Sequence, residues 1–212
     1  MKFCNYLIIS ILSILFIFNN IEEVLAQKVR YGYSQDDDGT VYKSLNDALK
    51  NPEKVYRLKL TGKRMDSIPE AVFKFYNLRE LTIKNCKLQI INQNIGKLGK
   101  LIYLNVSANQ LVRLPRQIAD LKELKGLVIS RNKICELPES IGTMSKLEII
   151  DAWDNPLYVL PESMANMTET LKIIDLRQIP LWSSEIDAME KLLPKTNVLT
   201  TSYCDCSMGG RK

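Results

Sequence analysis

The chain has 212 residues, 46% of them hydrophobic and 25% charged, which is typical of one globular domain with a buried core. Histidine is absent, and this excludes Ser-His-Asp and Cys-His nucleophiles as well as histidine metal sites. Lys and Arg number 29 against 24 Asp and Glu, and the basic residues form no run of five or more. We therefore expect neither hydrolase chemistry nor a nucleic-acid partner.

The first 26 residues have the pattern of a signal peptide. Lys2 precedes an apolar run from Tyr6 to Phe18, and a polar stretch then leads to small or short residues ending at Ala26. The run of 13 residues would span about 20 Å as a helix, which is short of the roughly 30 Å hydrocarbon core of a bilayer. We expect cleavage after Ala26 and a secreted or cell-envelope protein with no stable membrane span. The alternative is an uncleaved signal that anchors the protein in the membrane.

Residues 27–54 are expected to cap the N-terminal end of the domain. The segment Gln35–Thr40 contains three aspartates and predicts a solvated polar loop, because it lacks the spacing and the terminal glutamate of a calcium-binding loop. Ser44–Leu49 predicts a short helix that begins at its serine. Three residues of this helix are expected to cover the open edge of the structure that follows: Leu45, Ala48 and Leu49.

Residues 55–181 consist of about six repeats with spacings of 23, 23, 23, 23 and 24 residues. The units begin at Val55, Leu78, Leu101, Leu124, Leu147 and Leu171. Within a unit, positions 1, 4, 6, 9 and 11 mix spacings of two and three, which no single helix face sustains. Position 9 is asparagine in three units and position 15 is proline in four: Asn109, Asn132 and Asn155; Pro69, Pro115, Pro138 and Pro161. The pattern predicts one short strand per unit, stacked about 4.8 Å apart.

The unit LxxLxLxxNxLxxLPxxIxxLxx resembles the leucine-rich repeat family in its 23-residue "LP" type. This resemblance implies an α/β leucine-rich repeat solenoid, with a curved parallel β-sheet on the concave face, loops and short helical turns on the convex face, and helical caps. We expect the asparagine amides to satisfy loop backbone groups that would otherwise be buried unpaired. Cys86 takes that place in the second unit, and the end units depart from the pattern with Lys63 and Ile179.

Residues 182–203 are expected to cap the C-terminal end, and residues 204–212 to form a flexible tail. A helix is predicted from Ser183 to Leu193, where a proline ends it, and a final strand is expected within Thr196–Thr201. The mature chain would hold four cysteines, whose three alternative pairings stay open: Cys86, Cys135, Cys204 and Cys206.

The family resemblance places positions 3, 5, 7 and 8 of each unit on the concave face. The first two units would present a basic end there, with Arg57, Lys59 and Lys84. The later units would present an apolar and aromatic strip rimmed by charge, which is typical of a protein-binding surface. The candidate partner-binding residues are Tyr103, Asn105, Val128, Arg131, Ile149, Asp151, Trp153, Asp154, Asp175 and Arg177. We expect Trp153 to contribute most.

The resulting hypothesis is an exported, non-catalytic recognition module that binds a protein or peptide on its concave face, as a monomer and without a cofactor or metal. An alternative is a glycan or cell-wall polymer on the same face, stacked on Tyr103 and Trp153. An enzymatic alternative would use Asp151, Asp154 and Asp175, which lack a nucleophile, a metal-binding pattern and a pocket. A signalling or GTPase-regulating scaffold is the alternative for a chain that is not exported, and it rests on fold-level analogy alone.

Overall fold

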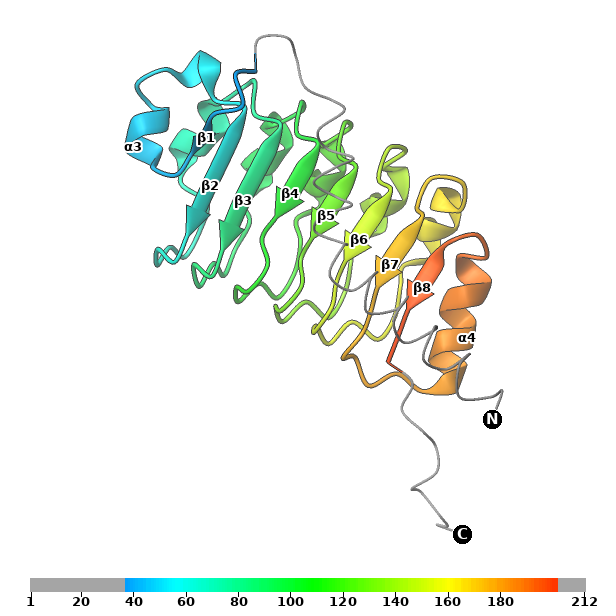
Figure 1. Cartoon of the computed structure of the whole chain (residues 1–212). Helices are drawn as coiled ribbons and strands as arrows, with labels where there is room; N and C mark the ends of the chain where they lie inside the picture. The colour runs from blue at the N-terminus through cyan, green and yellow to red at the C-terminus, as the bar shows by residue number, and fades with distance from the viewer. Residues whose placement is uncertain (1–36, 202–212) are drawn as a thin grey trace, which may run out of the picture. The chain divides into compact units, whose positions relative to one another are not determined.

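The computed structural model describes residues 37–201, which form an all-parallel, eight-stranded sheet with its strands in chain order (Figure 1). The strands are β1 (Val41–Tyr42), β2 (Arg57–Thr61), β3 (Glu80–Lys84), β4 (Tyr103–Asn105), β5 (Gly126–Val128), β6 (Ile149–Asp151), β7 (Ile173–Asp175) and β8 (Asn197–Leu199). The predicted solenoid with one strand per repeat is confirmed. The signal peptide predicted at 1–26 and the tail predicted at 204–212 lie outside the described residues.

Pairing between strands keeps the repeat in register. Leu58 pairs with Leu81, Leu81 with Leu104, and Leu104 with Leu127, so position 4 of each unit lies beside position 4 of the next. These leucines are buried, and the residues on either side of them point to the other face because side chains alternate along a strand. The inward residues of all units form one continuous hydrophobic core.

The turn after each strand has the same backbone conformation in every unit. Position 8 has φ between 54° and 69° at Gly62, Asn85, Ala108, Arg131, Asp154 and Gln178. Glycine and asparagine accept this left-handed conformation readily, whereas a residue such as Ala108 holds it at a cost of about 1–2 kcal/mol. The N–H at this position extends the ladder beyond the strands, as where Arg131 donates to the Trp153 carbonyl at 2.8 Å. The surrounding framework therefore fixes the turn whatever side chain occupies it.

The asparagine amides at position 9 satisfy buried backbone groups, as predicted. Asn109 accepts the N–H of Cys86 at 2.9 Å and donates to the Ile83 carbonyl at 2.7 Å, so it bonds to the preceding unit. Asn132 and Asn155 repeat this arrangement in the next two units. In the second unit, the Cys86 thiol lies 3.3 Å from a backbone carbonyl oxygen of its own unit. The asparagines thus join successive turns through the interior of the solenoid.

Short 3-10 helices return the chain along the convex side. They are η1 (Pro52–Lys54), η2 (Glu70–Lys74), η3 (Gln93–Lys97), η4 (Arg116–Asp120), η5 (Glu139–Thr143) and η6 (Glu162–Met167). The proline at position 15 directly precedes four of them, because its fixed φ suits the start of a helix and it has no N–H to satisfy. Serines at position 17 link neighbouring helices, as where the Ser163 hydroxyl donates to the Glu139 carbonyl at 2.7 Å.

The N-terminal cap adds strand β1 to the edge of β2, which the sequence pattern did not predict because two residues show no periodicity. The predicted short helix is confirmed as α3 (Leu45–Ala48), with Ala48 buried. Leu49 follows the helix and is 38% exposed, so the prediction that it covers the edge is wrong. The solvated loop predicted at 35–40 is wrong for Asp37, whose buried carboxylate forms an ion pair of 2.9 Å with Arg57.

The C-terminal cap consists of helix α4 (Ser183–Leu192) and strand β8, and both confirm the sequence prediction. Glu185 accepts the N–H of Trp182 at 2.7 Å and so stabilises the start of the helix. Met189 and Leu193 are buried and belong to the hydrophobic core. Within residues 37–201, none of the helices combines the length and the hydropathy needed to cross a bilayer.

Candidate functional site

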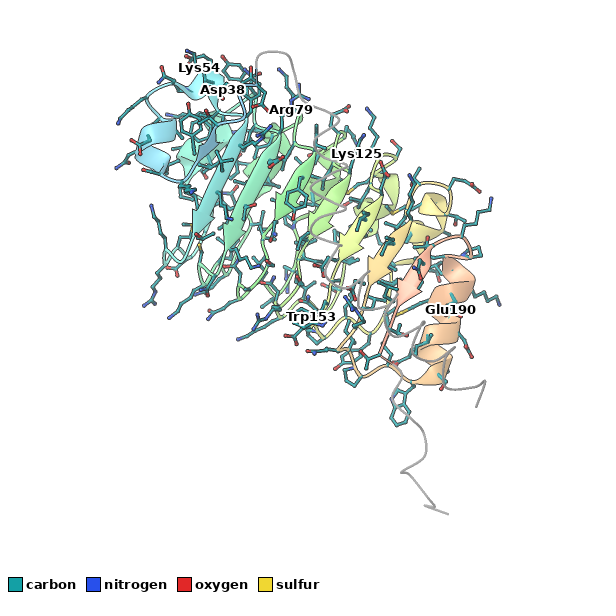
Figure 2. The ribbon with its side chains drawn as sticks, in the orientation of Figure 1. Asp38, Lys54, Arg79, Lys125, Trp153 and Glu190 are labelled. Carbon is teal, nitrogen blue, oxygen red and sulfur yellow. The ribbon has the colours of Figure 1, made fainter. Side chains whose placement is uncertain are left out.

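Strand register aligns the predicted binding residues in rows across one face of the sheet. Position 3 gives Tyr103, Gly126, Ile149 and Ile173, and position 5 gives Asn105, Val128, Asp151 and Asp175. The residues of positions 7 and 8 follow where the strands end, and Figure 2 shows Trp153 at that edge of the sheet. The structure thus places all ten candidates on this face or at its edge, in units 3 to 6.

Six residues from units 4 to 6 are joined by hydrogen bonds, a cation–π contact and the pairing of Asp151 with Asp175 on neighbouring strands, and we refer to them as the Trp153 cluster: Ser130, Arg131, Asp151, Trp153, Asp175 and Arg177. Position 5 shapes the cluster, because its side chain accepts the N–H of position 7. Asp151 accepts from Trp153 at 3.2 Å, and Asp175 accepts from Arg177 at 3.1 Å. A short carboxylate that bonds two residues ahead is a frequent turn-forming device. The strand ends therefore hold the side chains of position 7 in place.

The two carboxylates of the cluster are in register on neighbouring strands and have different partners. Asp175 is buried, and both of its oxygens accept hydrogen bonds from the Arg177 guanidinium. Asp151 has the Ser130 hydroxyl at 3.1 Å as its only side-chain donor among the described residues. Burial, together with the negative charge of Asp175, raises the pKa of Asp151 to about 6. Asp151 is therefore the less compensated of the two charges.

Trp153 is half-buried and held by several contacts. The guanidinium carbon of Arg131 lies 5.7 Å from the centroid of its ring, a cation–π geometry that contributes about 0.5–1 kcal/mol. The backbone N–H of Trp153 donates to the Asp151 carboxylate, and the backbone carbonyl of Trp153 accepts from the Arg131 N–H at 2.8 Å. The ring is thus a positioned aromatic group at the edge of the concave face, with both signs of charge beside it.

The remaining candidates differ in how much surface they offer. Asn105 is buried and donates to the Tyr103 hydroxyl at 3.2 Å, so these two form a polar pair on β4. Val128 and Ile149 point outward but are 0% and 1% exposed. Asp154, at position 8, is exposed.

Sequence reasoning missed Ser130 as a member of the site. The repeat alignment places it at position 7 of unit 4 on the concave face, beside Trp153 and Arg177, but it was not among the ten candidates, and its contact with Asp151 is what makes it a member. The basic end predicted in the first two units is weaker than its composition suggests. Arg57 is matched by Asp37 at 2.9 Å and by Glu80 at 3.8 Å.

The side chains of this face are suited to binding a partner. The carboxylates of the cluster accept hydrogen bonds from backbone, hydroxyl and guanidinium donors that already belong to the chain. Within the described part of the chain, no three Cys, Asp or Glu side chains are grouped so that they could hold a metal ion. The Cys86 and Cys135 thiols are both free, the first buried and the second exposed.

A family model described as a leucine-rich repeat region matches residues 54–201. The chain belongs to the leucine-rich repeat family. The match begins beside Val55, the first residue of the predicted repeats, and extends through α4 and β8. A search of curated proteins finds no match.

Solved leucine-rich repeat structures share the fold of this leucine-rich repeat protein. A leucine-rich repeat protein of Leptospira interrogans has a TM-score of 0.55 at 25% identity, covering 76% of this chain and 54% of its own. The leucine-rich repeat domain of the type III effector XopL has a TM-score of 0.60 at 26% identity, covering 72% and 54%. An internalin of Listeria monocytogenes has a TM-score of 0.56 at 19% identity, covering 71% and 42%.

This leucine-rich repeat protein therefore spans about half the length of those proteins, or less. Repeats of this family commonly serve protein–protein interaction, and proteins with this fold are typically non-catalytic.

Proposed function

We propose that this leucine-rich repeat protein is an exported, non-catalytic recognition module that binds a protein or peptide through the Trp153 cluster on its concave face. The observation that carries the proposal is the state of Trp153. Its ring is partly exposed and lies against the Arg131 guanidinium, and its backbone N–H is bonded to Asp151, so a partner that covers the ring orders it at a reduced entropic cost. Aromatic and arginine side chains of this kind dominate the energetics of protein interfaces.

A glycan or cell-wall polymer is the weaker alternative for the same face. Sugar binding needs aromatic faces free for stacking and unengaged groups for hydroxyl recognition. Arg131 already lies over the Trp153 ring, and the Tyr103 hydroxyl already accepts from Asn105. These contacts favour a polypeptide partner, which can exchange salt bridges and hydrogen bonds with the cluster.

Partner capture with single-residue variants tests the binding proposal. The purified protein and its Trp153→Ala variant are immobilised, and retention of proteins from the producing organism is quantified. We expect Trp153→Ala to weaken retention of a specific partner about tenfold or more, because a central aromatic residue contributes about 2 kcal/mol to an interface.

Trp182→Ala is the matched control, since Trp182 is 60% exposed and lies outside the concave face, before α4. Both variants must melt within a few degrees of the parent for the comparison to count. Equal retention by Trp153→Ala and the parent protein would overturn the proposal. A glycan array on which Trp153→Ala loses binding to a polysaccharide, with no protein retained, would instead establish the glycan alternative.

Export rests on the sequence of residues 1–26 and has its own test. The full chain is produced in a secreting host, and the N-terminal residue of the released protein is determined. Gln27 as the first residue supports cleavage after Ala26. Retention of the whole chain with Met1 at its start contradicts it, and recovery of that form in the membrane fraction establishes the anchored alternative.

A further inference from the structure

The turns after strands β2 to β5 make one edge of the sheet strongly basic. Residues 61–67, 84–90, 107–113 and 130–136 contain seven Lys or Arg and two Asp or Glu, a net charge of +5 that equals the net charge of the whole chain. Five exposed cations on these turns form no side-chain hydrogen bond or ion pair within residues 37–201. We call them the basic edge: Lys63, Arg64, Lys87, Arg113 and Lys133.

On the opposite edge, where the strands begin, some cations have acidic partners. There Lys146 pairs with Glu123 of the preceding unit at 2.7 Å, and Lys172 pairs with Glu148 at 2.8 Å. Figure 2 shows Lys125 on this opposite edge, away from Trp153. Acids one repeat earlier in the chain thus pair with these two cations, whereas the five cations of the basic edge have no such partner within residues 37–201. Unpaired like charges repel one another, so a negatively charged partner would relieve them.

An apolar hollow of about 560 Å³ opens on the same edge. Its apolar lining comes from Ile90, Ile91, Val112 and Pro115, and two cations of the basic edge, Arg113 and Lys133, line it as well. Ile90 is 61% exposed and Val112 is 46% exposed. Large aliphatic side chains that are exposed side by side mark an interaction surface more often than they mark ordinary solvated surface.

The hollow lies where the pairing of the return segments is interrupted. Isolated parallel bridges join Ser67 to Ile90 and Arg113 to Glu136. Among the described residues no bridge joins Ile90 to Arg113, and the hollow is lined by both. Units 2 and 3 thus lack the bridge that joins units 1 and 2 and units 3 and 4 on this side, and the hollow at this step has room for a side chain from outside.

We infer that the basic edge binds an acidic peptide segment that inserts one or two aliphatic side chains into the hollow between units 2 and 3. The positive charge of the basic edge favours a partner with carboxylates. The apolar lining of the hollow favours an aliphatic side chain, which a sulfated polysaccharide does not carry. The turn 130–136 contributes to both surfaces, but none of the five cations of the basic edge and none of the residues that line the hollow belongs to the Trp153 cluster, so the occupant need not be the partner on the concave face.

Fluorescence anisotropy of two synthetic peptides with the full chain tests this inference. One peptide has six acidic residues around a central Leu-Leu pair, and the other has Ser-Ser in the centre. At about 50 mM salt we expect the leucine peptide to bind about tenfold more tightly, since burial of two aliphatic side chains favours binding by more than the cost of ordering them. Raising the salt to about 300 mM should weaken both peptides, because exposed charges are then screened.

Charge reversal locates the site. The double variant Lys87→Glu/Lys133→Glu should weaken the leucine peptide about tenfold or more, because it replaces two attractive charges with two repulsive ones. Lys97→Glu/Lys122→Glu makes the same change in net charge on exposed lysines of the convex side and should alter binding less than about twofold. Val112→Ser should reduce the preference for the leucine peptide over the serine peptide.

Three outcomes would overturn the inference: equal binding of the two peptides, equal loss in the two double variants, or a leucine preference that Val112→Ser leaves unchanged. Heparin that binds the basic edge while neither peptide does would assign this surface to polyanions and would also overturn it. Trp153→Ala should leave the peptide affinity unchanged, so failure here and failure of the concave-face proposal are distinguishable.

Discussion

Asp151 shows how one residue of the binding face affects the stability of the whole sheet. It lies in register beside Asp175, whose carboxylate is paired with the Arg177 guanidinium. The hydrogen bonds that Asp151 itself accepts come from uncharged donors, the Ser130 hydroxyl and the Trp153 N–H. Its pKa of about 6 lies above the ordinary value of 3.8. The folded state therefore binds this proton more tightly than the unfolded state, and stability falls as pH rises from about 4 to about 6 and then levels off.

We expect Asp151→Asn to stabilise the protein at pH 8 by about 1–3 kcal/mol, because the ionised carboxylate is removed from beside Asp175. The amide oxygen can still accept the N–H of position 7, as Asn105 does from Ser107 at 3.0 Å in unit 3. Urea unfolding at pH 4, 6 and 8 measures the effect. The advantage of the variant should be small at pH 4 and grow to its full value near pH 7.

Asp187→Asn is the control for this measurement, since it removes the same charge from an exposed position on α4. A similar gain in stability from Asp187→Asn would attribute the effect to net charge instead. Equal stability of Asp151→Asn and the parent protein at all three pH values would contradict the raised pKa.

At the scale of the elements, the close packing of η5 on η6 limits what the convex side accepts. A Cβ atom added at Gly142 would lie 2.2 Å from the Ser163 carbonyl oxygen, well inside van der Waals contact. That oxygen belongs to the backbone of η6, so it cannot move without shifting the helix. Gly142 thus sets the spacing between units 4 and 5 on the convex side, as strand pairing sets it on the concave side.

Gly142→Ala should therefore destabilise the protein by about 1–3 kcal/mol, because η6 must move away from η5. Thermal or urea unfolding measures the change. Gly99→Ala is the matched control: nothing lies within 4 Å of a Cβ added there, and its effect should stay within about 0.5 kcal/mol. If the two alanine variants were equally stable, the convex side would be more deformable than the contact distances indicate.

At the scale of the whole molecule, the fold could be predicted from the sequence because each structural position of the repeat occurs about six times. Inward positions, strand positions and the asparagine turn could be recognised even where single units deviate, as at Cys86. Strand β1 has no such redundancy, since it lies before the first unit and contains only Val41 and Tyr42. The same holds for the ion pair between Asp37 and Arg57, which joins residues 20 positions apart outside the repeat period.

The candidate site was predictable in place but not in detail. Alternation along a strand tells which face a side chain points to, so all ten candidates lie on one face or its edge. It does not tell how far neighbours cover that side chain, and Val128 and Ile149 are buried although they point outward. Contacts between units, such as Ser130 with Asp151, depend on side-chain conformations that no spacing encodes. The exposed hollow beside Val112 was likewise not predicted, because it depends on the shape of the return segments.

The direction of the asparagine bonds has a consequence for synthesis of the chain. The backbone N–H groups of Cys86 and Leu88 donate to the side-chain oxygen of Asn109. This asparagine follows them in the chain by 23 and 21 residues. A ribosome makes the chain from its N-terminus, so each turn stays open until the asparagine of the next unit has left the exit tunnel. Folding of units 2 to 4 therefore lags translation by one repeat.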